Sequence, residues 1–267
     1  MKKLLFLLLL IHGLVLNAQK NYLDENKIPI NDTTSAKFYK IIELDNNTGG
    51  YKELYFYISG EKESETYYVK SLSTTGFVQN GKSLSWYENG RLKSEANNIN
   101  GKRNGKELTY YENGQLKSDL SYKDDKHEGE IVTYWKNGKL KRKDIYNNGK
   151  FEYGNCYDSL GNEIKHFEYE IMPQYKGGDS KLLSDIANNI DYPTSSKNAG
   201  IQGRVVVRFA VNSDGTISSV DILKGVSPEL NKEAMRVVKT LKKFKPGYQD
   251  GEAVPVFYMV PITFSLK

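Results

Sequence analysis

Residues 203–224 read GRVVVRFAVNSDGTISSVDILK. Valine or phenylalanine occupies every second position from 205 to 211, and arginine precedes the run at 204 and stands within it at 208. Such alternation is typical of a β-strand that buries one face. Asp214-Gly215 is a turn signal, and apolar residues resume at Ile217. The stretch therefore predicts an antiparallel hairpin.

Helix signals stand on both sides of this hairpin. Residues 179–190 carry apolar residues at helical spacing, with Asp179 able to cap the start. Ser227 and Pro228 open a second helix, in which Ser227 is the N-cap and Pro228 the first helical residue. A closing strand follows at 254–266. We therefore expect an α+β domain with a three-stranded antiparallel sheet packed against two helices.

The order of these signals is distinctive. It runs through Tyr192-Pro193, Gly203, Asp214-Gly215, Ser227-Pro228, Pro246-Gly247 and the closing strand. Over about residues 172–267 this order resembles the C-terminal domain of the TonB family, the periplasmic end of an energy transducer. The resemblance implies a protein-binding module rather than an enzyme.

The closing strand has a pattern typical of a sheet edge. Pro255 and Pro261 share one parity, so their missing N–H donors lie along the same side of the strand. A central strand does not tolerate two such gaps, which predicts an edge strand. Phe257 and Met259, between the prolines, keep donors on that side. The edge therefore offers a short template for an added strand.

The TonB resemblance implies what that template binds. In the family, the last strand and the segment around the Tyr-Pro pair receive a short extended peptide of an outer-membrane transporter. The resemblance thus implies a peptide-binding site made of Val256, Phe257, Tyr258, Met259, Val260, Asp191, Tyr192 and Pro193. The implied partner is an outer-membrane transporter or another envelope protein.

The middle of the chain repeats itself. The segments SWYENGRLK (85–93), TYYENGQLK (109–117) and TYWKNGKLK (133–141) follow one another at an offset of 24 residues. Each contains an Asn-Gly pair, which favours a hairpin with a type I′ turn and would place Tyr87 opposite Leu92. Residues 153–166 look like a decayed fourth copy. A repeat of this length predicts a stacked array.

The array resembles MORN-like hairpin repeats of bacterial exported proteins over about residues 76–166. We therefore expect a mainly β region with a β segment at 19–75 and repeats at 76–170, followed by the TonB-like domain at 171–267. The repeated Tyr and Trp rings supply the hairpins' own core on one interpretation. On the other, they form a platform for sugars such as those of peptidoglycan.

Residues 1–18 have the layout of a secretory signal peptide. Lys2 and Lys3 precede an apolar run at 4–16, and Ala18 stands at the expected cleavage site. We expect export to the periplasm of a Gram-negative bacterium and no stable membrane span. The alternative is an inner-membrane anchor formed by an uncleaved leader. The net charge of +5 gives no case for nucleic acid.

Residues able to do chemistry are sparse. Cys156 is the single cysteine, and His127 and His166 are the histidines outside the leader. We expect no catalytic residue, metal or cofactor, since these residues would have to converge and no familiar catalytic motif is present. The expected function is an exported periplasmic protein-binding module associated with transmembrane transport. The alternative is a structural or cell-wall-associated scaffold without a transport role.

Overall fold

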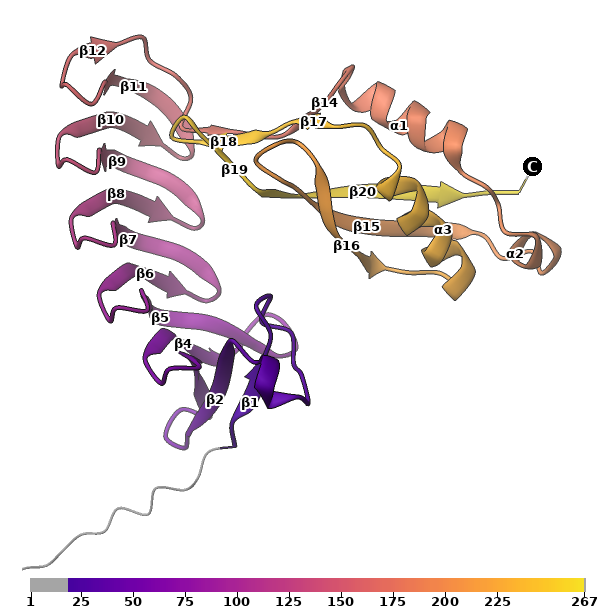
Figure 1. Ribbon diagram of the computed structural model, residues 1–267, viewed down its shortest axis with the longest axis horizontal. Coiled ribbons are helices and arrows are strands. Elements are labelled where there is room, and N and C mark those ends of the chain that lie inside the picture. Colours follow the sequence, from indigo (N-terminus) through magenta and orange to yellow (C-terminus); the bar gives the residue numbers. More distant parts are fainter. Residues whose placement is uncertain (1–18, 267) are drawn as a thin grey trace, which may run out of the picture. The chain divides into compact units, whose positions relative to one another are not determined.

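The computed structural model describes residues 19–266, so the predicted signal peptide at 1–18 lies outside the described residues (Figure 1). The chain divides into two compact units, the first ending at His166 and the second beginning at Phe167. Within residues 19–266, no helix has the length and apolar character needed to cross a membrane.

The first unit is a meander of antiparallel strands in which each strand pairs with its neighbours in the chain (Figure 1). A short 3₁₀ helix, Thr33–Ser35, is the only helical element described before His166. The mainly β character predicted for this region is confirmed. The strands are β1 (Asn21–Leu23), β2 (Phe38–Asp45), β3 (Gly50–Tyr57), β4 (Lys62–Lys70), β5 (Phe77–Trp86), β6 (Leu92–Ile99), β7 (Lys102–Tyr110), β8 (Leu116–Lys123), β9 (Lys126–Tyr134), β10 (Leu140–Asn147), β11 (Lys150–Tyr157) and β12 (Glu163–Ile164).

The Asn-Gly turns differ from the predicted type I′ turn. Gly90 has a φ of +77°, whereas Asn89 is not among the residues with positive φ. The N–H of Gly90 donates to the carbonyl of Tyr87 at 2.9 Å, and the N–H of Tyr87 donates to the carbonyl of Arg91 at 2.8 Å. These bonds define a type I turn followed by a glycine bulge.

The different turn shifts the register by one residue. Leu92 lies opposite Trp86 and not opposite Tyr87. The asparagine side chain supports this turn, because Oδ1 of Asn89 accepts the N–H of Arg91 at 3.0 Å. The next two copies repeat this contact, with Tyr110 opposite Leu116 and Tyr134 opposite Leu140.

An aromatic residue at the start of each turn bonds to the next turn of the array. The donor is a ring hydroxyl or an indole N–H, and the acceptor is the carbonyl of the last residue before the following turn. Lys93, Lys117 and Lys141 stand over the rings of Tyr87, Tyr111 and Trp135, with Nζ between 4.4 and 5.7 Å from the ring centre. The series is Tyr57 to Trp86 (3.0 Å), Tyr87 to Tyr110 (2.7 Å), Tyr111 to Tyr134 (2.8 Å) and Trp135 to Tyr157 (2.9 Å).

We call this series of side-chain bonds from one turn to the next the turn ladder. It favours the structural interpretation of the aromatic rows over a sugar platform, because their polar atoms and part of their ring faces already make contacts within the array.

The decayed copy keeps the same turn. The N–H of Asp158 donates to the carbonyl of Asn162 at 2.9 Å, and the N–H of Gly161 donates to the carbonyl of Asp158 at 3.0 Å.

The second unit contains the predicted three-stranded antiparallel sheet, in the order β16, β15, β20 (Figure 1). Two small strand groups, β13-β18-β19 and β14-β17, were not predicted. The elements are β13 (Glu170–Ile171), β14 (Gln174–Tyr175), α1 (Gly178–Asn189), α2 (Thr194–Asn198), β15 (Gly203–Val211), β16 (Ile217–Lys224), α3 (Pro228–Lys239), β17 (Phe244–Lys245), β18 (Gly247–Gln249), β19 (Glu252–Val254) and β20 (Val256–Phe264).

The two longer helices begin in different ways. The helix start at Ser227 is as predicted, since its Oγ accepts the N–H of Leu230 at 3.3 Å. Helix α1 begins after Gly177 instead, and Asp179 lies in its first turn without capping it. The sheet and the helices share one apolar core. It includes the fully buried side chains of Val205, Val207, Phe209 and Val211 from β15, Leu230, Ala234, Val237 and Val238 from α3, and the buried Val260, Ile262 and Phe264 from β20.

Candidate peptide-binding edge

Strand β20 is an edge strand, as the two prolines predicted. It pairs along its whole length with β15, from Val256 opposite Val211 to Phe264 opposite Gly203. Among the described strands, β20 has no partner on its other side. One long side of β20 is therefore open to a further strand.

The side-chain pattern shows which backbone groups face the open side. Side chains at even positions, such as Val260 and Ile262, are buried, while Phe257 and Met259 are 61% and 62% exposed. In an antiparallel strand, the N–H and C=O of one residue point to the same neighbour and alternate along the chain. Pro261 lies opposite Val206 and has no N–H to donate to β15. The backbone groups of Pro261, and of the other odd-numbered residues of β20, therefore point to the open side. The donors of Phe257 and Met259 follow this direction.

Tyr258 lies between these two donors and points the other way. Its ring is partly buried against the core, with its centre 5.6 Å from those of Phe209 and Phe244. Its hydroxyl donates to Oδ1 of Asp179 at 3.0 Å. Burial, and then the bond to Asp179, raise the pKa of Tyr258. The hydroxyl therefore stays protonated at neutral pH and fixes the start of α1 beside the edge strand.

A pocket of about 520 Å³ opens beside Tyr258 on the helix side of the sheet. Its walls come from β13, β14, the start of α1, the segment around Pro246, and β20. The lining residues include Ile171, Met172, Pro173, Asp179, Tyr248 and Tyr258. A concave, largely apolar site thus lies next to the open strand edge.

The second part of the predicted site lies elsewhere on the unit. The Tyr192 ring packs edge-on against Phe264, with centres 5.7 Å apart, and its hydroxyl donates to the carbonyl of Ile201 at 2.5 Å. Phe264 is six residues from Tyr258, or roughly 20 Å along a strand. Tyr192 therefore packs at the far end of β20 from Tyr258, while Val260 is four residues, or roughly 13 Å, from Phe264. Peptide contact by either group stays a prediction.

The Tyr-Pro segment is held by a residue that the sequence patterns did not single out. Glu233 on α3 is buried, and its Oε1 accepts the backbone N–H of Asp191 at 2.7 Å. Arg236 donates to both oxygens of the same carboxylate at 2.7 Å. Burial acts to raise the pKa of Glu233, but the bonds from Arg236 and Asp191 outweigh it, and the pKa is lowered. The sequence signal that could have found this pair is the spacing of Glu233 and Arg236, three residues apart on a predicted helix.

Replacing Glu233 by glutamine is expected to destabilise the second unit at pH 7 by about 1.5–3 kcal/mol, the usual contribution of hydrogen bonds to a charged group. Since the pKa of Glu233 is lower in the folded state, its stabilisation is complete above an unfolded pKa of roughly 4.3 and is lost as the pH falls further. The difference between variant and parent should therefore shrink toward pH 3. Hydrogen exchange of the α3 amides measures it.

Glu229→Gln is the matched control, because Glu229 is exposed in the first turn of the same helix. Its effect should stay below about 1 kcal/mol. A Glu233→Gln variant that matches this control at pH 7 would contradict the role given to the carboxylate.

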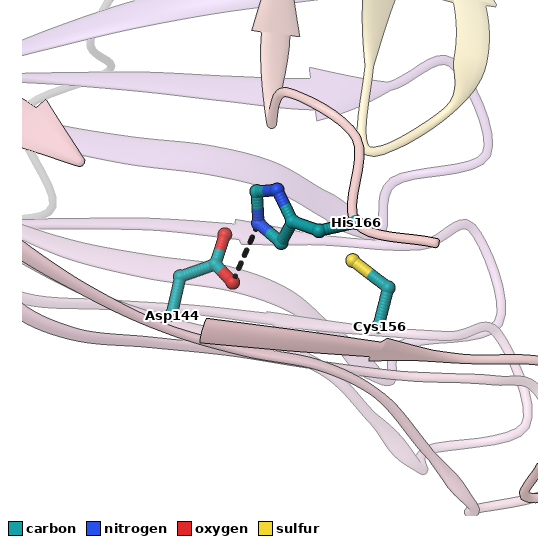
Figure 2. A group of neighbouring side chains, drawn as sticks. All are labelled: Asp144, Cys156 and His166. Carbon is teal, nitrogen blue, oxygen red and sulfur yellow. Dashed lines mark hydrogen bonds and ion pairs between the residues drawn. The ribbon is translucent and has the colours of Figure 1, made fainter. Parts of the chain in front are cut away.

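A second cluster of chemically active side chains lies in the first unit (Figure 2). Asp144 on β10, Cys156 on β11 and His166 after β12 place one carboxylate oxygen, Sγ and one ring nitrogen within 4.8 Å of one another. Nε2 of His166 is 3.1 Å from Oδ1 of Asp144, and the dashed line in Figure 2 marks this contact. Sequence reasoning did not foresee this convergence. His127 is not part of it.

A buried arginine accounts for the carboxylate in this cluster. Arg142 is 0% exposed, and its Nη1 lies 2.5 Å from Oδ2 of Asp144 and 3.3 Å from Nε2 of His166. Ligands of a tetrahedral zinc ion at about 2.0–2.3 Å would place the guanidinium charge close to the metal. The arrangement fits a buried ion pair within β10, with His166 in contact with its carboxylate, better than a metal site.

Comparison with known proteins places both units. Residues 188–266 match the family model for the Gram-negative bacterial TonB protein C-terminal. Residues 79–98, 103–124 and 128–148 match the model for a MORN repeat variant. Both resemblances inferred from the sequence are confirmed.

The similar proteins align with about a third of this chain. Protein TonB from two strains of Helicobacter pylori is 28% identical over 88 residues, which is 33% of this chain and 30% of each relative. The chain thus matches less than a third of their length. Two NMR structures of the Helicobacter pylori TonB C-terminal domain each align with 33% of this chain, at 26% and 27% identity, with TM-scores of 0.28 and 0.27. They are covered over 79% and 92% of their own length.

Proposed function

We propose that the second unit, which carries a TonB C-terminal domain, captures an extended peptide by adding it to the open edge of β20. The edge position of this strand is the observation that carries the proposal. Backbone hydrogen bonds from Phe257 and Met259 would supply affinity, as they do in other cases of strand addition. Pro261 would end the pairing, because it offers no donor.

The partner proposed here is an outer-membrane transporter or another envelope protein with a short extended segment. TonB-family membership of residues 188–266 supports this choice of partner. The leader-like residues 1–18 support export to the periplasm. The proposed role is protein binding associated with transport across the envelope.

A proline at position 259 tests strand addition. Met259→Pro removes one donor from the open edge without removing a bond to β15, so the fold should persist while peptide affinity falls at least tenfold, or about 1.4 kcal/mol. The measurement is a titration of the full ¹⁵N-labelled chain with seven-residue peptides from the periplasmic ends of transporters of the same organism. Amides of 256–260 should shift first in the parent.

Met259→Val is the matched control, because it changes the side chain and keeps the donor. Strand addition is the wrong mechanism if both variants bind alike, or if shifts cluster at the basic residues Arg236, Lys239, Lys242, Lys243 and Lys245. Retention of the chain on purified peptidoglycan, with no peptide binding, would favour the scaffold alternative instead.

A further inference from the structure

We propose that the pocket beside Tyr258 receives one large apolar side chain of the captured peptide and so selects which peptides bind. This inference rests on the proposed strand addition. It adds a specificity site on the helix side of the sheet to the backbone pairing along β20.

The pocket lies beside the part of the open edge where an added strand would pair. Tyr258 lines the pocket and lies between the two outward donors, Phe257 and Met259. Its side chain points to the helix side of the sheet, where it contacts Phe209 and Phe244. Side chains of an added strand alternate between the two faces of the sheet. A strand seated beside 257–259 therefore directs every second side chain to the helix side of the sheet, and the one nearest Tyr258 faces the pocket.

The side chains that line the pocket favour an apolar occupant. Ile171, Met172 and Tyr248 line it and remain 42%, 64% and 37% exposed. Apolar side chains so exposed at a concave site are typical of binding surfaces. The charged groups of the lining, Asp179 and Lys245, have opposite signs and give no preference for a charged occupant. An apolar side chain gains most by covering these walls.

The volume sets the size of the occupant. A pocket of about 520 Å³ lies within the usual range for ligand sites and has room for an aromatic ring. Polar residues would leave the exposed Met172 and Ile171 in contact with water and gain less from burial. The preferred ligand is thus an extended peptide with a phenylalanine-sized residue at the pocket-facing position.

The methionines make the test specific. The chain has four, Met1, Met172, Met235 and Met259. Met172 lines the pocket, Met259 lies on the other face of the edge strand, and Met235 lies on α3. The full chain labelled with ¹³C at methionine methyls therefore reports separately on the pocket, the edge and a remote position. Single substitutions assign the signals.

Two kinds of probe are titrated. N-acetyl-phenylalanine N-methylamide occupies a pocket without forming a strand, and N-acetyl-glycine N-methylamide is its control. An acetylated seven-residue threonine peptide with one central phenylalanine is compared with the same peptide carrying serine there. We expect the phenylalanine amide to shift Met172 alone. We expect the phenylalanine peptide to shift Met172 and Met259 and to bind at least fivefold more tightly than the serine peptide.

The outcomes separate the pocket from the strand. If both peptides shift Met259 with equal affinity and the phenylalanine amide leaves Met172 unchanged, the pocket has no such role while strand addition stands. If the phenylalanine amide shifts Met172 and neither peptide shifts Met259, strand addition fails, and the peptide is excluded as the occupant.

Discussion

Replacing Asp144 by alanine is expected to lower the free energy of unfolding of the first unit by about 3–5 kcal/mol. Arg142 is 0% exposed, and its guanidinium would lose the carboxylate that lies 2.5 Å away. His166, 3.3 Å from the guanidinium, cannot replace a negative charge. Hydrogen exchange of the amides of β9 to β11 measures the loss in this unit alone.

The paired replacement is the control. Arg142→Met combined with Asp144→Leu removes both charges and keeps side chains of similar bulk, so its stability should return to near the parent value. If Asp144→Ala lowers the free energy of unfolding by less than about 1 kcal/mol, water reaches the arginine, and the ion pair does not stabilise the first unit.

Replacing Phe209 by alanine is expected to destabilise the second unit by about 3–5 kcal/mol, the usual cost of removing a fully buried aromatic ring. Phe209 is 0% exposed and packs against Phe244 and Tyr258, with ring centres 5.7 and 5.6 Å away. Tyr258 would lose the surface that holds it between the two outward donors. Urea unfolding followed by amide signals of β15 measures the effect.

Phe257→Ala is the matched control, because Phe257 lies on the neighbouring strand and is 61% exposed. It should cost less than about 1.5 kcal/mol, since it loses mainly a contact with Arg208, whose guanidinium carbon is 5.2 Å from the ring centre. Equal losses in the two variants would contradict the assignment of the buried face of the sheet.

The local patterns predicted the fold of the second unit well. Strand alternation at 205–211 and the Ser227-Pro228 helix start act over a few residues, so the sequence displays them directly. The edge position of β20 was also predictable, because a proline removes a donor whatever surrounds it. The pairing of Glu170 with Gln249 was not, because it joins residues 79 positions apart through two-residue strands that carry no period.

The candidate site was predictable only where it depends on the backbone. The outward donors of Phe257 and Met259 followed from parity, but the pocket at Tyr258 is assembled from segments far apart in the chain. The Asp144 cluster escaped prediction because the register of β10 and β11 brings it together. The turn error shows the same limit: an Asn-Gly pair is compatible with two kinds of hairpin turn, and the pair alone does not say which one forms.

The turn ladder has a consequence for how the first unit can change in length. Each aromatic donor reaches a carbonyl about one repeat further on, so a new copy of 24 residues inserted between two existing copies would find both a donor before it and an acceptor after it. Every such duplication would add two strands, or roughly 10 Å, without remaking either end. The length of the array can thus change in fixed steps when a repeat is duplicated.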